Sequence, residues 1–375
     1  MIDSHKLIEL LNHKGAGLIT GVPDSLLADF CAVLSDSDSH LPAPNEGSAV
    51  ALAAGHYLAT GRPSVVYMQN SGLGNAVNPL ISLADPEVYA IPMLLIISWR
   101  GENGIKDEPQ HVKQGRITPA FLEVLGISYR IVGPDSNIEM EIDLAWESMR
   151  CRSGPAAMLI RKGTFKEIES FGEKRLRPDS SLMTREKAIE CILEQLSSND
   201  MVVSTTGRAS RELWELRLKR GEYCADFLTV GSMGHTSAIT LAAAWARPDR
   251  RFICLDGDGA LLMHMGILGL AGSSRPANFW HILLNNSCHE SVGRQPVCAV
   301  GLEFALLAQN CGYSSARRLT SQSEIAEVFI NLRDINGPHF LEILVAPISR
   351  IDLGRPGMTP KENGARFMTR MTKGL

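Results

Sequence analysis

Short runs that are apolar at successive positions, and so on both faces of a strand, alternate along this chain with longer stretches of helical periodicity. The runs VVYM at 65–68 and MLLIIS at 93–98 carry apolar side chains at almost every position. A strand of this kind has to be covered on both faces, as in parallel sheets with helices on each side. We therefore predict a doubly wound, parallel α/β fold. The predicted strands of the first half are 17–22, 64–69, 92–98, 129–132 and 156–161, and its helices are 25–34, 47–60, 75–84 and 137–151.

A second alternation follows a break in the pattern. The stretch 163–182 is charged and contains glycine, proline and paired serines, which is typical of a linker. After it we predict strands at 201–205, 227–230, 251–256, 279–285 and 340–344, and helices from 185 and at 212–220, 237–245, 262–271, 304–311 and 324–333. Thr184 is the predicted N-cap of the first of these helices, and Ser321 with Glu324 forms a predicted capping box. The predicted organisation is an N-terminal domain at 1–165, a linker at 166–183, a second α/β domain at 184–350 and a C-terminal tail at 351–375.

The length, net charge and cysteine spacing of the chain exclude several classes of protein. The chain has 375 residues, which at roughly 150 per domain suggests two large domains. Its formal net charge is −4 and no block of lysine and arginine stands out, which argues against nucleic-acid and membrane-surface partners. No apolar run reaches 18 residues and the first residues do not resemble a secretory signal. The eight cysteines show no C-x-x-C spacing, so we expect a reducing cytoplasm.

The string Asp256-Gly257-Asp258-Gly259-Ala260 follows a predicted strand and precedes a predicted helix. Glycines at such a turn let the backbone approach an anion, and the helix N-terminus supplies free N–H groups. Another predicted strand ends in Asn285-Asn286, and neighbouring parallel strands end at the same edge of a sheet. Asp258 and Asn286 are therefore expected around one cation, and a carboxylate with an amide oxygen suits Mg²⁺ better than zinc. A glycine turn beside a polar strand end, without a ligand, is the alternative, and the spacing of the two motifs counts against it.

A GDG motif followed by paired asparagines at this spacing resembles the diphosphate–magnesium motif of thiamine diphosphate enzymes. The resemblance implies that Asp258 and the side chain of Asn286 bind Mg²⁺, with the backbone carbonyl of Cys288 as a third protein ligand. It also implies that thiamine diphosphate is the cofactor. The residues expected to contact its diphosphate are Gly257, Gly259 and Ala260, together with Thr206 and Gly207 from the similar turn at 204–208.

Three other segments resemble cofactor-contacting parts of this family. Met233, in a loop that also supplies Ser232, is expected beneath the pyrimidine and thiazolium rings; a buried core methionine is the alternative. Glu46 opens a helix of small residues and is expected to hydrogen-bond a pyrimidine nitrogen; a favourable contact with the helix dipole is the alternative. The loop from residue 69 to 75 resembles the pyrimidine-side loop, and its expected cofactor contacts are Asn70, Gly72 and Leu73.

Within the family, the chain looks like the phosphonopyruvate decarboxylases. Two domains in 375 residues leave no room for the middle domain of larger members. The likeness covers nearly the whole chain, and it is carried by strings such as GVPDSLL, NEGSAVALAAGHYLATG, WRGENGIKDEPQHVKQGRIT and LNNSCHESVGRQP. Sulfopyruvate decarboxylases are similar as well. One departure is Arg294, because Gly-Gly-Gln-Pro is expected where this chain has Gly293-Arg294-Gln295-Pro296.

The implied substrate ends in a phosphonate, which needs cationic and amide donors near the cofactor. The residues expected to contact the substrate are Ser25, Lys106, His111 and Arg294, with Arg100, Lys113 and Arg116 as further candidates. The residues expected to be catalytic are Glu46, Asp24, His111 and His289. The segment 102–116 contains Gly, Pro and alternating charges, so we predict a mobile lid there; a solvated loop is the alternative.

The resemblance implies non-oxidative decarboxylation of 3-phosphonopyruvate to phosphonoacetaldehyde and CO₂, through a cofactor ylide and an enamine, in phosphonate antibiotic biosynthesis. Decarboxylation of sulfopyruvate, a carboligation of two keto acids and a cofactor-binding subunit without activity are the alternatives. The missing middle domain counts against the carboligation, and the presence of Glu46 and Asp258 counts against an inactive subunit. The resemblance also implies a homodimer or larger homo-oligomer in which Glu46 of one subunit meets Asp258 of another.

Overall fold

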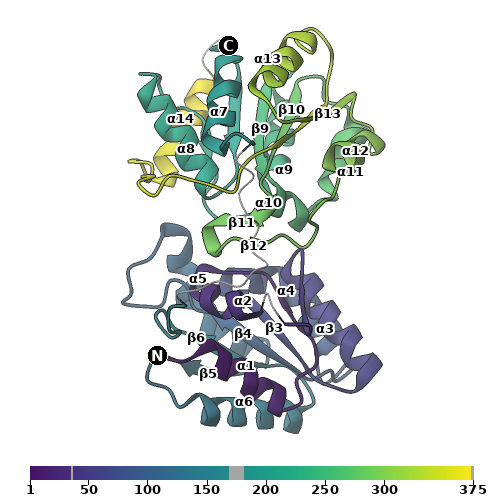
Figure 1. Cartoon of the computed structure of the whole chain (residues 1–375), viewed down its shortest axis with the longest axis vertical. Coiled ribbons are helices and arrows are strands. Elements are labelled where there is room, and N and C mark those ends of the chain that lie inside the picture. The colour runs from purple at the N-terminus through teal and green to yellow at the C-terminus, as the bar shows by residue number, and fades with distance from the viewer. Residues whose placement is uncertain (35–36, 169–180, 373–375) are drawn as a thin grey trace. The chain divides into compact units, whose positions relative to one another are not determined.

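A computed structural model describes residues 1–34, 37–168 and 181–372 (Figure 1). They form two compact units, one of residues 1–168 with 292–298, the other of residues 181–291 with 299–372. Each unit contains a six-stranded sheet in which every pair of neighbouring strands is parallel. The predicted class, α/β with two parallel sheets, is confirmed. Residues 169–180 of the predicted linker lie outside the described part of the chain.

The sheet of the first unit has the strand order β2-β1-β3-β4-β6-β5. Its strands are β1 (Ile19–Gly21), β2 (His40–Pro42), β3 (Ser64–Gln69), β4 (Met93–Ser98), β5 (Ser128–Val132) and β6 (Ala156–Ile160). The α-helices of this unit are α1 (Ser4–His13), α2 (Ala28–Leu34), α3 (Glu46–Thr60), α4 (Leu73–Pro79), α5 (Pro109–Val124) and α6 (Ile138–Arg152). Short helical turns at Ser25–Leu27, Asn70–Gly72 and Leu80–Ala84 flank α2 and α4.

Alternate side chains of the central strands enter two different cores. Leu94 and Ile96 of β4 pack with α1, α2 and α6 on one face, while Leu95 and Ile97 pack with α3, α4 and α5 on the other. Each fully buried aliphatic side chain of this kind contributes about 1.5–3 kcal/mol to folding. The double covering explains why these strands read as unbroken apolar runs.

The sheet of the second unit has the strand order β13-β14-β10-β9-β7-β8. Its strands are β7 (Met201–Ser204), β8 (Phe227–Leu228), β9 (Phe252–Gly257), β10 (Phe279–Asn285), β13 (Ser315–Leu319) and β14 (His339–Leu344). Its helices are α7 (Arg185–Glu194), α8 (Arg208–Lys219), α9 (Thr236–Ala246), α10 (Asp258–Met263), α11 (Ile267–Ser274), α12 (Phe304–Asn310), α13 (Gln322–Asn331) and α14 (Pro360–Thr372). The loop after β10 carries the short elements β11 (Cys288–His289), a turn at Glu290–Val292 and β12 (Gln295–Pro296).

Two helix ends of this unit follow the predicted chemistry. The Thr184 side chain accepts a hydrogen bond from the backbone N–H of Lys187 at 3.2 Å and caps α7. Ser321 and Glu324 form the reciprocal pair of bonds of a capping box at the start of α13. Both predictions are confirmed, because a cap depends only on residues within one turn.

Several stretches differ from the sequence-based expectation. The segment 102–116, expected to be a loop or lid, contains the start of α5 at Pro109. Proline fits the first position of a helix, and Gly115 is required inside this one, because a Cβ there would lie 1.8 Å from the carbonyl oxygen of Gly101. The terminal stretch, expected to show little periodicity, contains α14, whose Asn363 bonds the backbone of β8. Helix α1 and strands β2 and β13 are not among the predicted elements.

No helix in the described ranges combines the length and the apolar character needed to span a membrane.

Candidate functional site

The second unit places the two predicted metal-binding motifs at one edge of its sheet. Strands β9 and β10 are parallel neighbours, with Gly257 paired to Leu284. Asp258 is therefore the first residue after one strand, and Asn286 is the first residue after the other. This is the arrangement that the spacing of the two motifs predicts.

Asp258 is a buried carboxylate with one free oxygen. Its side chain is 4% exposed, and its Oδ2 has no hydrogen-bond partner among the described residues. Burial raises the pKa of the Asp258 carboxyl to about 7, although the backbone N–H groups of Gly259 and Ser287 lower it. A buried oxygen that lacks a donor is costly unless a cation binds it. Asp258 thus fits an oxygen-coordinated cation.

The glycines of the motif make room for neighbouring side chains. A Cβ on Gly259 would lie 2.9 Å from Cε1 of His289 and 3.6 Å from Cε of Met233. Gly234 has φ +89°, and a Cβ there would lie 2.9 Å from the carbonyl oxygen of Ala260. The structure thereby brings Met233, His289 and the start of α10 together. Burial lowers the pKa of His289 to about 4, so its ring is neutral at pH 7.

The turn after β7 approaches the same loop. Gly207 has φ +95°, a conformation that favours glycine, and it immediately precedes α8. The Thr206 hydroxyl accepts a hydrogen bond from the backbone N–H of Gly231 at 3.1 Å, which ties this turn to the loop that carries Ser232. Ser232 is exposed and has φ +46°.

The two asparagines after β10 make different contacts. Asn285 donates to Oε1 of Glu342 on β14 at 2.8 Å, so it joins neighbouring strands. Asn286 is buried, and its Oδ1 accepts from the backbone N–H of Cys288 at 3.2 Å. Its Nδ2 donates to Glu290 at 3.4 Å. Cys288 is buried as well.

In the first unit, Glu46 begins α3 and is only 5% exposed. Its Oε2 accepts a hydrogen bond from Nδ2 of Asn75 on α4 at 2.8 Å. Gly72 lies directly beside it, since a Cβ on Gly72 would be 2.4 Å from Oε1 of Glu46. The sequence reasoning did not single out Asn75 as a partner of Glu46. The two residues are 29 positions apart, so no local pattern connects them.

Asp24 joins the ends of three strands of this unit. Its carboxylate accepts from the Ser98 hydroxyl at 2.8 Å, from the backbone N–H of Leu26 at 2.8 Å and from Nε2 of Gln69. Three donors therefore already surround this predicted catalytic carboxylate, which is buried.

Arg100 follows β4 and lies beside the predicted substrate residues. Its Nε and Nη2 donate to the Asp107 carboxylate, the first at 2.8 Å, and its Nη1 donates to the Ser25 hydroxyl at 2.8 Å. His111 is 9% exposed, and its Nδ1 has no partner among the described residues. Burial, with Arg100 nearby, lowers the pKa of His111. The structure thus gathers Ser25, Arg100 and His111, and Asp107 is a member that sequence reasoning missed.

The remaining predicted residues of this unit are placed differently. The Asn70 side chain is buried and donates to the carbonyl of Arg100 and to the Thr118 hydroxyl, both at 2.9 Å. Leu73 is buried at the start of α4. Lys106 is exposed. Arg294 is half-buried and has φ +61°, a conformation that side chains rarely adopt.

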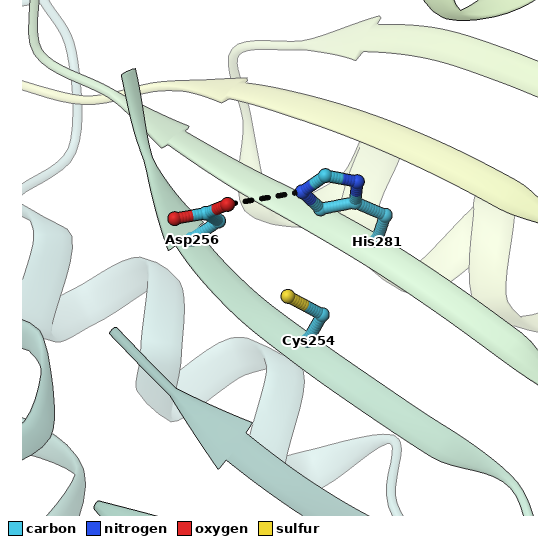
Figure 2. A group of neighbouring side chains, drawn as sticks. All are labelled: Cys254, Asp256 and His281. Carbon is cyan, nitrogen blue, oxygen red and sulfur yellow. Dashed lines mark hydrogen bonds and ion pairs between the residues drawn. The ribbon is translucent and has the colours of Figure 1, made fainter. Parts of the chain in front are cut away.

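A second group of metal-ligand residue types lies in the core of the second unit. Atoms of Cys254, Asp256 and His281 lie within 4.8 Å of one another (Figure 2). Both ring nitrogens of His281 are engaged, one by Asp256 at 3.3 Å and the other by the Tyr313 hydroxyl at 3.1 Å. Burial raises the pKa of the Cys254 thiol, which keeps it protonated. This group is best explained as a hydrogen-bonded core cluster.

Comparison with known proteins matches both units to one enzyme family. Residues 4–120 match the N-terminal TPP-binding domain of thiamine pyrophosphate enzymes, and residues 205–343 match their C-terminal TPP-binding domain. A phosphonopyruvate decarboxylase from Streptomyces viridochromogenes is 34% identical over 99% of this chain and 96% of its own length. Another from Streptomyces hygroscopicus is 33% identical over 98% and 93%.

A sulfopyruvate decarboxylase from Methanosarcina acetivorans is 28% identical over 96% of this chain and 96% of its own length. All three similarities extend across both units, and the two Streptomyces proteins exceed 30% identity over nearly their full lengths. The chain therefore belongs to the phosphonopyruvate decarboxylase family of thiamine pyrophosphate (thiamine diphosphate) enzymes.

Proposed function

We propose that this protein decarboxylates 3-phosphonopyruvate to phosphonoacetaldehyde and CO₂, with thiamine diphosphate and Mg²⁺, in phosphonate antibiotic biosynthesis. The observation that carries the proposal is the similarity to a phosphonopyruvate decarboxylase over 99% of this chain. The buried carboxylates Glu46 and Asp258, each the first residue of a helix, support it.

The metal in this proposal binds Asp258, the side chain of Asn286 and the backbone carbonyl of Cys288. The unpartnered Oδ2 of Asp258 supports this assignment, because a divalent cation would supply the missing positive charge. Asp258 and Asn286 would hold the cation, and the cation would supply positive charge for the cofactor's diphosphate. Thr206, Gly207, Ser232, Gly257, Gly259 and Ala260 are the proposed contacts of the diphosphate.

Thiamine diphosphate, when bound, supplies a thiazolium carbon that accepts the electron pair released as the carboxylate of the keto acid leaves. The proposed work of the protein is to position that cofactor and to move protons. Glu46 would hold a proton at a pyrimidine nitrogen, and Asn75 restrains one of its two oxygens. Met233 is proposed beneath the cofactor rings, and Asn70, Gly72 and Leu73 belong to the proposed pyrimidine-side loop. Because the Asn70 side chain is already engaged, its cofactor contact would come from the backbone.

For the substrate's phosphonate we propose Ser25 and His111, with Arg100 as a donor beside them. The positive charge of Arg100 is neutralised by its ion pair with Asp107, so the positive charge that balances the phosphonate has to come from other residues. Lys106 and Arg294 are the proposed sources, because neither has an acidic partner among the described residues. Asp24 and His289 complete the proposed catalytic set. The three donors around Asp24 favour a role in holding strand ends over proton transfer.

The test compares phosphonopyruvate, sulfopyruvate and pyruvate with the purified protein, Mg²⁺ and thiamine diphosphate, by CO₂ release. We expect kcat/KM for phosphonopyruvate to exceed that for pyruvate by at least about a hundredfold, as a few charge-assisted hydrogen bonds supply. Glu46→Gln, which keeps the size of the side chain, is the matched control and should retain the cofactor but lose turnover. Comparable rates on pyruvate would refute a phosphonate site.

Decarboxylation of sulfopyruvate is the second candidate, supported by the relative from Methanosarcina acetivorans. Both substrates end in a tetrahedral oxyanion, but a phosphonate carries up to two negative charges and a sulfonate one. A higher kcat/KM on sulfopyruvate in the same assay would select this alternative.

We further propose a homodimer or larger homo-oligomer in the cytoplasm, with each site shared between subunits. The placement of Glu46 and Asp258 in different units supports this proposal, because each cofactor site then needs both kinds of unit. In the proposed oligomer, the unit with Glu46 and the unit with Asp258 come from different subunits.

A further inference from the structure

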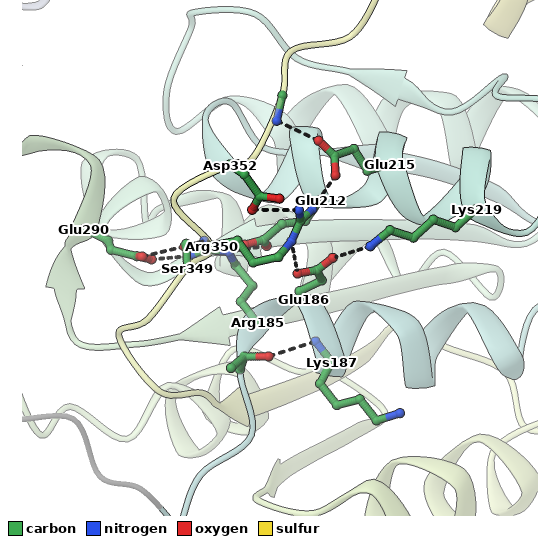
Figure 3. A network of polar contacts seen from close by, with 12 residues as sticks. Arg185, Glu186, Lys187, Glu212, Glu215, Lys219, Glu290, Ser349, Arg350 and Asp352 are labelled. Carbon is green, nitrogen blue, oxygen red and sulfur yellow. Dashed lines mark hydrogen bonds and ion pairs between the residues drawn. The ribbon is translucent and has the colours of Figure 1, made fainter.

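Glu290 lies four positions after Asn286 and is held at one place by several donors. Its side chain is 4% exposed, and Arg185, the first residue of α7, donates from Nη1 to Oε2 at 2.7 Å (Figure 3). The Ser349 hydroxyl donates to Oε1, and Nη1 of Arg208 lies 3.7 Å from the same oxygen. These contacts hold the side chain of Glu290 in one position, as the acceptor of an ion pair with Arg185.

Arg185 is fixed in turn by a second carboxylate. Glu212 on α8 accepts from its Nε at 2.7 Å and from its Nη2 at 2.9 Å, in the two-pronged geometry that arginine makes with carboxylates (Figure 3). Arg185 also donates to the Ser349 hydroxyl at 2.7 Å. A bidentate pair restricts rotation of the guanidinium, so the position of Glu290 is defined from α7 and α8.

The contact of Glu290 with Asn286 has a chemical direction. A carboxylate can only accept, so the amide group that faces Oε2 of Glu290 at 3.4 Å has to be the NH₂. A separation of 3.4 Å makes only a weak hydrogen bond. The negative charge of the Glu290 carboxylate is therefore the main reason that the NH₂ group of Asn286 faces it and the amide oxygen does not. The amide oxygen is left on the other side, where the backbone N–H of Cys288 uses one of its two lone pairs at 3.2 Å.

We infer that Glu290 is a positioning residue for the magnesium site: it orients the Asn286 amide so that oxygen, and not nitrogen, is presented to the cation. The inference rests on the proposed binding of Mg²⁺ by Asp258 and Asn286. Groups that orient metal ligands in this way commonly change metal affinity by about 10–100-fold when they are replaced.

The first test titrates Mg²⁺ into the metal-free protein at saturating thiamine diphosphate and follows binding by calorimetry or tryptophan fluorescence. Glu290→Gln, which allows the amide to turn, should weaken Mg²⁺ binding by about 10–100-fold. Glu215→Gln is the matched control, since Glu215 accepts from Arg350 and from the backbone of Gly354 in the neighbouring part of the network but bonds neither Arg185 nor Glu290, and it should change the Mg²⁺ affinity by less than about threefold. Equal losses in the two variants would mean that Glu290 acts only through the stability of the network, and would overturn the inference.

The second test reverses the sign of the effect. In an Asn286→Asp background the ligand is a carboxylate, which has no nitrogen end to misplace and is repelled by Glu290. Adding Glu290→Gln to that background should therefore tighten Mg²⁺ binding, whereas the same substitution weakens it in the natural chain. A loss of affinity in both backgrounds contradicts orientation, and this comparison stays informative if Glu290→Gln alone lowers the melting temperature.

Asp258→Ala separates failure of the inference from failure of the proposed function. If Asp258→Ala leaves Mg²⁺ affinity unchanged, the metal site itself is assigned wrongly, and the inference falls with it. If Asp258→Ala abolishes binding while Glu290→Gln does not alter it, the metal site stands and only the positioning role is refuted.

Discussion

Gly72→Ala should displace the Glu46 carboxylate without disturbing the backbone. Gly72 has φ −71°, which any residue can adopt, so the substitution carries no backbone strain. The new Cβ would lie 2.4 Å from Oε1, 2.5 Å from Cγ and 2.6 Å from Cδ of Glu46. Ordinary van der Waals contact begins near 3.4 Å, so the carboxylate has to retreat by about 1 Å.

That displacement is large for a group that works by position. A misplacement of about 1 Å can cost about a hundredfold in rate, which corresponds to about 2.7 kcal/mol of activation free energy. The 2.8 Å bond from Asn75 to Oε2 should be stretched as well. We therefore expect the exchange of the cofactor's thiazolium proton to slow by about a hundredfold, with the affinity for thiamine diphosphate changed far less.

The assay is quenched-flow hydrogen–deuterium exchange, read by NMR of the extracted cofactor, alongside calorimetric titration of thiamine diphosphate. Gly74→Ala is the matched control, because it lies two residues away and a Cβ there would meet nothing within 4 Å. An exchange rate in Gly72→Ala equal to that of Gly74→Ala would refute the reasoning that Glu46 acts from a fixed position.

Three other outcomes are expected. Asp258→Ala should abolish Mg²⁺-dependent retention of thiamine diphosphate in a calorimetric titration, whereas Cys288→Ala should be mild because only its carbonyl is used; equal losses would contradict the ligand assignment. The half-buried His289 has a folded-state pKa of about 4 against 6.5 in the unfolded chain, so its contribution to stability is present above pH 6.5 and is lost as pH falls toward 4, by at most about 3 kcal/mol. Chemical unfolding across that range should show a shallower slope in His289→Gln, and an unchanged slope would contradict burial of a neutral ring. Mixing inactive Glu46→Ala and Asp258→Ala chains after dissociation should restore roughly a quarter of wild-type activity if sites are shared, and no recovery despite subunit exchange would mean that each chain builds its own site.

Much of the fold could be predicted from the sequence because its determinants are local. β3 and β10 begin and end at the predicted residues, since a buried parallel strand is an unbroken run of apolar side chains. The caps of α7 and α13 depend on residues three positions apart. The edge strand β13 was not predicted because two of its five residues are exposed arginines, which interrupt the run of apolar side chains.

The candidate site also has parts that the sequence predicts and parts that it does not. Asp258 and Asn286 could be placed together from the sequence, because parallel neighbouring strands bring their carboxyl ends to one edge. The helix that begins at Pro109, inside the predicted lid, could not be predicted, because the sequence does not show that Gly101 contacts Gly115 and needs a helix residue without a side chain.

The contacts that orient the site residues depend on tertiary structure and could not be predicted. Asn75 reaches Glu46 across 29 positions and Arg185 reaches Glu290 across 105. A side-chain amide or guanidinium has the same local propensity whether or not its partner is near, so no pattern along the chain records such a pair. The order of residues along the chain is enough to identify the groups that can do the chemistry. Their orientation follows from the fold, because hydrogen-bond direction depends on where distant segments meet.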